Sequence, residues 1–290
     1  MKTKTKKILV YTLTLLASIA ALVMLYVFFP KSLESIDNRF RDYMFILRGE
    51  IPQNNQVVIV DIDEKSLKQI GQWPWSRDVL STLLENLTKA GVGIIGFDIV
   101  FAEEDRTSPH KILNQFDIQK KNIPNYDEQF AQTIAHTPTI LGYQFQLNET
   151  EFLENRTPQI PAIFVEKNRN LNQDYVINAK GTILNIPLVQ ENSYSSGFFN
   201  NVPDESGIIR SVPLIIRYNE QLYPSLAFEL LRAALGVKKV VVNYNDLGVQ
   251  DVSLGDITIP TDRYGRVIVN YRGKERTFKY LSASTVINNE

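Results

Sequence analysis

The chain has 290 residues, a net charge of −1 at neutral pH and a pI near 6.2, so its charge balance gives no reason to expect nucleic acid as a partner. It contains no cysteine, which excludes disulfides and cysteine-based zinc sites. A domain without disulfides depends on its hydrophobic core, and about 260 residues are enough to build one.

The run from Ile8 to Phe29 predicts a helix that crosses a membrane. It reads ILVYTLTLLASIAALVMLYVFF and contains no charge, proline or glycine. At about 1.5 Å per residue it spans about 33 Å, and the hydrocarbon core of a bilayer is about 30 Å thick. A cleaved signal peptide is the alternative, but its apolar region is shorter, about 7–15 residues, and this run continues well past the small residue Ala20. We therefore expect a basic segment at 1–7 and a lipid-embedded anchor at 8–29.

The charges on either side of the anchor predict its orientation. Four lysines precede it: Lys2, Lys4, Lys6 and Lys7. After it, Lys31 is balanced by Glu34. Because positive charge stays on the cytoplasmic side, we expect a cytoplasmic N-terminus in a plasma or bacterial inner membrane, with the main domain in the periplasm or outside the cell.

The segment after the anchor predicts an amphipathic helix. Apolar side chains recur there at helical spacing: Leu33, Ile36, Phe40, Met44 and Leu47. Gly49 and Pro52 end the pattern. We expect this helix to continue outward from the membrane, with a break or bend near Pro30, and to dock on the domain that follows.

The next segments predict a βαβ unit. Val57–Asp63 (VVIVDID) is a β-branched run, and Val92–Phe101 (VGIIGFDIVF) is a second continuous apolar run. Between them, residues 76–90 carry leucines at helical spacing, with Ser76 as the expected N-cap. Because both runs are apolar throughout, we expect them to form a parallel, buried pair of strands.

The remainder predicts a mixed α/β domain, with a βαβ parallel core and an antiparallel β extension. We expect a loop at 103–124, a helix at 126–135 and a strand at 139–147. The second half alternates short β-rich stretches with turns and contains one clear helix at 225–235. No linker rich in glycine, proline or serine interrupts residues 31–290, so we expect them to form one domain.

Acidic side chains follow both strands of the predicted βαβ unit. Asp61 and Asp63 end the first strand, and Asp98 lies near the end of the second. Ligands of open α/β sheets bind at the carboxyl ends of strands, and such acids can hold Mg²⁺ and a phosphate, as in aspartate-dependent phosphatases. The threonine expected in that phosphatase motif is Lys65 here. We favour the structural alternative, in which these acids cap turns, accept backbone N–H bonds or pair with Arg77.

Both tryptophans lie in the pentapeptide Trp73-Pro74-Trp75-Ser76-Arg77. Two indoles around a proline could stack on a ligand while Arg77 holds an anion. Alternatively, the aromatic rings fix the loop against the domain and present Ser76 as a helix cap. We favour the structural role.

The sequence contains no complete catalytic or cofactor-binding constellation. The two histidines, His110 and His136, are far apart and have no cysteine near them, so they support neither a zinc site nor a catalytic triad. Phosphate-binding glycine motifs are absent from the sequence. We predict no catalytic residue, no metal and no cofactor in this chain.

Several segments together resemble the CHASE2 family of extracytoplasmic sensor domains. The most specific are WPWSR, GFDIVF with its trailing acids, and the paired Asp-x-x-Gly turns at Asp204–Gly207 and Asp262–Gly265. The likeness runs in step from about Leu33 to the end of the chain. It implies the sensing part of a membrane receptor, with the sensor outside, further membrane helices after it and a cytoplasmic output, most often an adenylate or guanylate cyclase. The segment FKYLSASTVINNE resembles the stretch before the last core strand of the family, which implies a domain truncated at its C-terminal end.

Three classes of function stay open. The leading one is a non-catalytic sensor module that binds an unknown small molecule at the carboxyl ends of the parallel strands and moves the amphipathic helix relative to the membrane. The residues expected there are Asp61, Asp63, Trp73, Trp75, Arg77 and Asp98. The second is a Mg²⁺-dependent phosphohydrolase built on Asp61 and Asp63. The third is an architectural domain that dimerises the receptor without a ligand, and a homodimer is expected because cyclases and kinases act as pairs.

Overall fold

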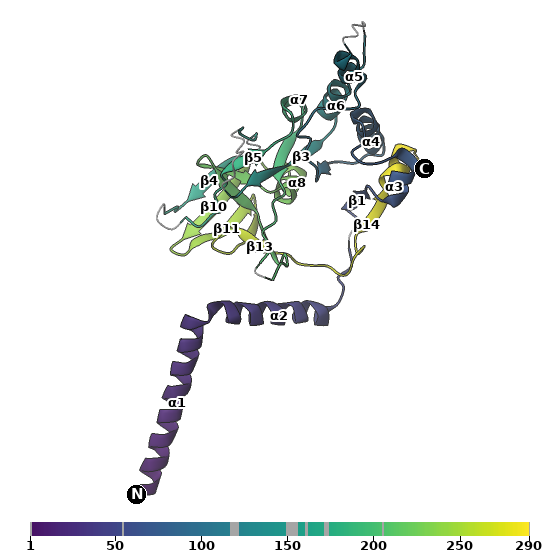
Figure 1. The fold of residues 1–290 in the computed structure, drawn as a ribbon. Helices are drawn as coiled ribbons and strands as arrows, with labels where there is room; N and C mark the ends of the chain where they lie inside the picture. Colours follow the sequence, from purple (N-terminus) through teal and green to yellow (C-terminus); the bar gives the residue numbers. More distant parts are fainter. Residues whose placement is uncertain are drawn as a thin grey trace. The chain divides into compact units, whose positions relative to one another are not determined.

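The computed structural model describes residues 2–53, 55–116, 122–148, 156–159, 162–170, 174–204 and 206–289 (Figure 1). The chain divides into two compact units. The first, here called the N-terminal unit, comprises residues 1–54 and Tyr271–Thr277, and the second, the α/β unit, comprises residues 55–270 and 278–290. The fold is mixed α/β with parallel and antiparallel sheets, as the sequence predicts.

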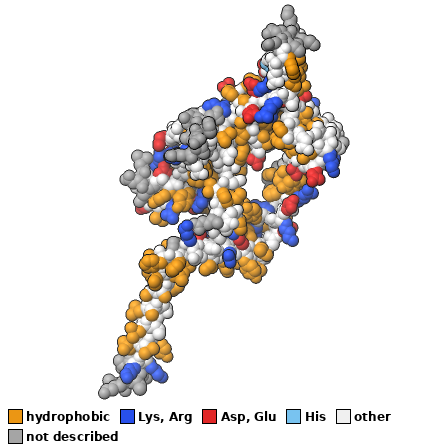
Figure 2. All heavy atoms as spheres, in the orientation of Figure 1, with side chains coloured by type: hydrophobic (Ala, Val, Ile, Leu, Met, Phe, Trp, Pro, Cys, Tyr) orange, Lys and Arg blue, Asp and Glu red, His pale blue; other side chains and the backbone are white. Residues whose placement is uncertain are grey.

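The N-terminal unit begins with the long helix α1 (Lys2–Phe28). Its stretch Lys6–Phe28 is long and apolar enough to cross a membrane, and none of it is buried against the rest of the chain. Apolar side chains line α1 along its length in Figure 2. The threonine hydroxyls in this stretch bond within the helix: Thr12 and Thr14 donate to the carbonyls of Leu9 and Tyr11, each over 2.9 Å. The helix thus presents no unsatisfied hydroxyl to lipid at these two positions.

Helix α2 (Pro30–Arg48) follows α1 after a break at a single residue. Phe29 has a non-helical backbone (φ −129°, ψ 46°), and the chain turns there so that α2 runs in a different direction from α1 (Figure 1). This confirms the break predicted near Pro30. Gly49 ends α2 with φ +75°, a backbone conformation that glycine adopts without strain. The docking of α2 on the following domain stays a prediction.

The parallel part of the α/β unit contains two groups of strands. The first pairs β1 (Val58–Asp61) with β14 (Lys279–Ser282). The second contains β2 (Ile95–Phe97), β3 (Thr139–Gln146), β5 (Gly181–Ile183) and β6 (Ser195–Phe198). In it β3 is parallel to β2 and β6 and antiparallel to β5.

This pairing corrects one expectation. The two apolar runs of the predicted βαβ unit do not pair with each other: among the described strands, β1 pairs with β14 alone and β2 pairs with β3. The partner of β1 lies at the far end of the sequence, where adjacency along the chain gives no signal. With one neighbouring strand only, β1 is half-buried and Val58 is 40% exposed.

Six helices accompany the strands of this part in the described residues. They are α3 (Glu64–Ile70), α4 (Arg77–Lys89), α5 (Pro109–Gln115), α6 (Tyr126–Ala135), α7 (Pro187–Glu191) and α9 (Ala283–Ile287). All of them except α5 contain buried residues. Helix α4 forms because leucines recur at helical spacing, and Leu80 and Leu84 pack fully buried against Phe97 and Phe130. Predicted helices match α4 and α6. Helix α5 forms within the stretch expected to be a loop, and α3 follows β1 where no helix was predicted.

The antiparallel part forms the rest of the α/β unit. Its largest sheet has the order β12 (Ile257–Pro260), β11 (Gly248–Leu254), β10 (Lys239–Asn245), β4 (Ile163–Lys167), with β4 parallel to β10. Two antiparallel strand pairs accompany it: β7 (Ser211–Pro213) with β13 (Arg266–Ile268), and the hairpin of β8 (Ile215–Tyr218) with β9 (Gln221–Pro224). The predicted helix is α8 (Leu226–Ala234), capped by Ser225.

Both predicted Asp-x-x-Gly turns are present. In each, the glycine N–H donates to the aspartate carbonyl over 2.9 Å, at Gly207 to Asp204 and at Gly265 to Asp262. The hydrogen bond from the Ser206 hydroxyl is the main cause that lowers the pKa of the Asp204 carboxyl to about 2.

Candidate functional site

The carboxyl ends of β1 and β14 carry a cluster of one acid and three hydroxyls. Asp63 is the N-cap of α3, and its Oδ1 accepts from the backbone N–H of Ser66 over 2.9 Å and from the Ser66 hydroxyl over 2.7 Å. The same oxygen accepts from the Ser282 hydroxyl over 2.8 Å. Ser66 in turn accepts from the backbone N–H of Ser284 over 3.0 Å. Asp63 therefore holds β1, α3, β14 and α9 together, in the capping role that the sequence favours.

These hydrogen bonds set the electrostatics of Asp63. The backbone N–H of Ser66 is the largest cause that lowers the pKa of the Asp63 carboxyl, and the hydroxyls of Ser66 and Ser282 lower it further. The carboxylate is thus ionised at neutral pH, and its Oδ1 accepts three hydrogen bonds. Asp61, two residues earlier, lies opposite Ser282 in the register of β1 and β14 and is half-buried.

The tryptophan loop packs on the core of the α/β unit. Trp75 is 4% exposed, and its indole N–H donates to the carbonyl of Gly71 over 2.8 Å. Trp73 meets it edge-on, with ring centroids 5.6 Å apart, and stays half-buried. The arrangement matches the structural role that the sequence favours for this loop, and Trp73 is the more accessible of the two rings.

Arg77 is the first residue of α4, and both its backbone N–H and its guanidinium make contacts with other parts of the chain. Its backbone N–H donates to Asp105 Oδ2 over 2.8 Å, so a carboxylate 28 residues away satisfies the helix N-terminus, whereas the Ser76 side chain bonds to Asp78. Its guanidinium donates to the carbonyl of Glu103 over 3.2 Å and lies 4.4 Å above the ring of Phe101. Arg77 thus binds the loop after β2 to α4.

The charge partner of Arg77 is Asp127 on α6. Arg77 Nε and Asp127 Oδ1 are 3.6 Å apart, and both side chains are less than a tenth exposed. Burial raises the pKa of the Asp127 carboxyl and lowers the pKa of the Arg77 guanidinium. Asp127 Oδ2 also accepts the backbone N–H of Asp105 over 2.9 Å. The pairing of Arg77 with an acid was foreseen, but its partner is Asp127 rather than one of the acids after the strands.

The candidate residues therefore differ in accessibility. Asp98 is exposed, and Asp61 and Trp73 are half-buried, so these three can meet a ligand. Asp63, Trp75 and Arg77 are committed to hydrogen bonds, packing and ion pairing within the α/β unit. Within the described ranges, no group of three or more histidine, cysteine, aspartate or glutamate side chains is placed to hold a metal ion.

Sequence reasoning missed the partners that hold this region together: Ser66, Asp105, Asp127, Ser282 and Ser284. Asp105 with Thr107 carries a local signal, because the aspartate accepts from the backbone N–H two residues on over 2.8 Å, a common turn pattern. The others lie far from their partners along the chain, and no local pattern marks them.

Comparison with known proteins gives one family. The model of the CHASE2 domain matches residues 19–290, which is nearly the whole chain. No curated protein and no solved structure matches. The matched range contains both strand ends, the tryptophan loop and the Arg77 cluster.

Proposed function

This chain belongs to the CHASE2 family of extracytoplasmic sensor domains, and we propose that it senses a small-molecule ligand at the carboxyl ends of β1 and β2. In this proposal Asp61, Asp98 and Trp73 meet the ligand. Asp63, Trp75 and Arg77 hold the loops that carry them. The chain contributes binding and relay rather than catalysis.

One observation supports the relay of a binding signal from the strand ends to α2 and α1. Strands β1 and β14 are joined at their carboxyl ends through Asp63 and Ser282, and both strands connect at their other ends to the N-terminal unit. Helix α2 ends at Arg48 and leads to β1 at Val58, while the segment Tyr271–Thr277 leads to β14 at Lys279. A ligand that changes the spacing of the strand ends thus acts on the two segments that lead to α2 and α1.

The N-terminal unit joins these two segments to each other. The backbone N–H of Ile51 donates to the carbonyl of Arg272 over 2.7 Å. The ring of Phe45 on α2 meets the ring of Tyr271 edge-on, with centroids 6.5 Å apart. A displacement of either segment is therefore passed to α2.

We further propose that the output is a cytoplasmic adenylate or guanylate cyclase and that the receptor acts as a homodimer. The resemblance supports the cyclase, and the pairwise action of cyclases supports the dimer. The four lysines that precede the apolar run Ile8–Phe29 support a cytoplasmic N-terminus.

Intrinsic fluorescence tests the ligand site, because both tryptophans of the chain lie in the loop at this site. The full chain in lipid nanodiscs is titrated with a library of small metabolites, and tryptophan emission and melting temperature are followed together. We expect at least one compound to change both. Asp61→Asn and Asp98→Asn should each weaken the binding of that compound about tenfold or more, since each removes a charged contact. Asp256→Asn, an exposed acid in the turn between β11 and β12, serves as the matched control.

The outcomes separate the three classes of function. If a compound stabilises the chain and binds Asp61→Asn and Asp98→Asn as tightly as the natural chain, the ligand site lies elsewhere. No stabilising compound at all favours the architectural domain. Hydrolysis of generic phosphate esters with Mg²⁺, lost in Asp61→Asn, favours the phosphohydrolase.

A further inference from the structure

We propose that α2 lies flat in the surface of the bilayer that α1 crosses, with one apolar face in contact with lipid. This face, here called the α2 stripe, consists of Leu33, Ile36, Phe40, Tyr43, Met44 and Leu47. The inference goes beyond the ligand proposal and does not depend on it, because it needs only α1 in a membrane. It replaces the expectation that the stripe docks on the soluble domain.

The α2 stripe is apolar and largely exposed. At about 100° per residue, its six members fall within a sector of about 100° on one side of the helix. Exposed fractions are 64% for Ile36, 62% for Phe40, 50% for Met44 and 62% for Leu47. A continuous face of large apolar side chains on a helix next to a membrane span marks a surface that needs a partner.

The protein contacts that α2 makes within the N-terminal unit lie on its other side. Phe45 packs against Tyr271, and Arg48 stacks 4.7 Å from the centroid of the Phe45 ring while donating to the Tyr271 carbonyl. Ile36 and Phe45 are nine residues apart, which places them about 180° apart around the helix. The contact with the segment Tyr271–Thr277 therefore leaves the α2 stripe uncovered.

The connection to α1 identifies the partner as lipid. Helix α2 begins two residues after α1 ends, so its first turn lies where the membrane span reaches the end of the hydrocarbon. The break at Phe29 turns α2 away from the direction of α1 (Figure 1), as required for a helix that lies in the membrane plane. The apolar surface of the α2 stripe is then continuous with the apolar surface that α1 presents to lipid.

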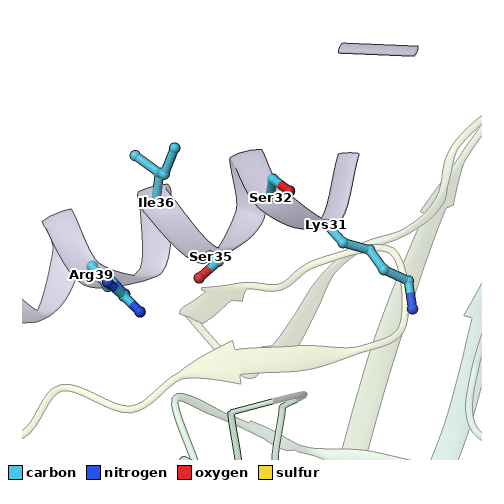
Figure 3. Close-up of a pocket in the computed structure, with 5 residues that line it drawn as sticks. All are labelled: Lys31, Ser32, Ser35, Ile36 and Arg39. Carbon is cyan, nitrogen blue, oxygen red and sulfur yellow. The ribbon is translucent and has the colours of Figure 1, made fainter. Parts of the chain in front are cut away.

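The polar side of α2 fits the headgroup region. Figure 3 shows Ile36 projecting from one side of the helix and Lys31 from the other, with Ser35 and Arg39 beside the lysine along a shallow open surface. Long basic side chains and aromatic rings such as Tyr43 are favoured at this depth of a bilayer. Helix α2 carries four basic and three acidic side chains, so apolar burial rather than attraction to anionic lipid provides most of the binding. Attachment to α1 keeps it at the surface and makes modest affinity sufficient.

Because the chain has no cysteine, single cysteines can report the depth of each side chain without a background. Residues Ile36, Phe40 and Leu47 of the α2 stripe, and the exposed Glu34 and Ser35 on the other side of the helix, are replaced one at a time by cysteine and labelled with the environment-sensitive dye NBD. The full chain is reconstituted in phosphatidylcholine vesicles. Quenching is measured with nitroxides on the lipid acyl chains and, separately, with a water-soluble quencher. Cysteines at Leu16 in α1 and at Asp256 serve as lipid and water references.

We expect labels at the three stripe positions to be blue-shifted, quenched by the lipid nitroxides and protected from the aqueous quencher. Labels at Glu34 and Ser35 should show the reverse. Stripe labels protected from both quenchers would overturn the proposal and show a protein partner, either the soluble domain or a second copy. Stripe labels open to the aqueous quencher would overturn it as well.

A charge substitution in the α2 stripe provides a second test of the proposal. Phe40→Glu should expose a label at Leu47 to the aqueous quencher, because a carboxylate in the stripe opposes lipid contact. Ser35→Glu places the same charge at an exposed position on the other side of the helix and should leave that label protected. An equal effect of the two variants contradicts the proposal. A label at Leu16 that stays quenched by lipid in both variants shows that α1 is still inserted.

Discussion

The hydroxyl of Ser282 donates to the carboxylate of Asp63 over 2.8 Å, and the two residues are 219 positions apart in the sequence. Asp63 lies two residues after the end of β1 and caps α3, while Ser282 ends β14 and precedes α9. One carboxylate oxygen thus joins the first strand of the α/β unit to its last strand. The contact lies at the edge where the ligand is proposed to bind.

Asp63→Ala should lower the melting temperature of the full chain, because it removes the cap of α3 and the link to β14 at once. Differential scanning fluorimetry in detergent micelles measures the change. Asp98→Ala is the matched control, since Asp98 is an exposed acid at the other strand end, and it should leave the melting temperature nearly unchanged. Equal effects of the two variants would contradict the role of Asp63.

The same carboxylate predicts a pH dependence. Hydrogen bonds from Ser66 lower the pKa of Asp63 in the folded chain relative to the unfolded chain. The stability that this group contributes is therefore fully present above the ordinary aspartate pKa and is lost as the pH falls through the lowered value. Melting temperatures measured from neutral to acid pH should fall in this window for the natural chain. They should fall less steeply for Asp63→Asn, which cannot titrate.

Asp127→Ala should lower the free energy of unfolding by about 3–5 kcal/mol, because it removes the ion-pair partner of the buried Arg77 guanidinium. Urea titrations followed by tryptophan emission measure this, since Trp75 packs in the same core.

A double-mutant cycle with Arg77→Met tests the physical cause of this loss. If the buried charge causes the loss, Asp127→Ala should cost much less in the Arg77→Met background. A cost of Asp127→Ala that is the same in both backgrounds would assign the loss to its bond with the Asp105 N–H instead.

Gly197→Ala should cost about 1–3 kcal/mol of stability or more, because a Cβ at this position in β6 would lie 2.6 Å from Cα and 2.7 Å from N of Leu226. These are backbone atoms at the start of α8, and they cannot move aside as a flexible side chain can. Gly93→Ala is the control, since its Cβ would meet nothing within 4 Å, and it should stay within about 0.5 kcal/mol. Urea unfolding of both variants gives the comparison, and a neutral Gly197→Ala would contradict the close approach of α8 to β6.

Replacing Lys2, Lys4, Lys6 and Lys7 by glutamine should weaken the orientation proposed for α1, because positive charge next to a membrane span favours the cytoplasmic side. A cysteine at Asp256 reports the side of the α/β unit by its reaction with a membrane-impermeant maleimide added to intact cells. The natural lysines should give complete labelling, and the glutamine variant a mixed population. Complete labelling in both would show that other features fix the orientation.

The sequence predicts the local elements well and the long-range pairing poorly. The leucines of α4, the aromatic and apolar spacing of α6 and the break near Pro30 all act over a few residues, and each prediction is confirmed. The pairing of β1 with β14 depends on residues more than 200 positions apart, so a prediction from neighbouring segments chose β2 instead and was wrong.

The candidate site shows the same division. The capping position of Asp63 follows from its place between a strand and a polar turn, and the burial of Trp75 follows from its size. The partner of Arg77 was missed because Asp127 lies in the first turn of a separate helix, where an acid is expected for helix stability alone. Only the packing of α4 against α6 makes it a partner of the arginine.

Strand β1 leaves a row of backbone N–H and C=O groups facing away from β14, and no strand in the described part of the chain pairs with them. Such an edge is a template on which another strand can add in parallel or antiparallel, from this chain or from a neighbour, and the β-branched side chains of Val58 and Ile59 favour that addition. Strand addition at β1 is therefore a route by which another strand can associate with this chain. A lysine in place of Val58 should disfavour such an addition without touching Asp61 or Asp63.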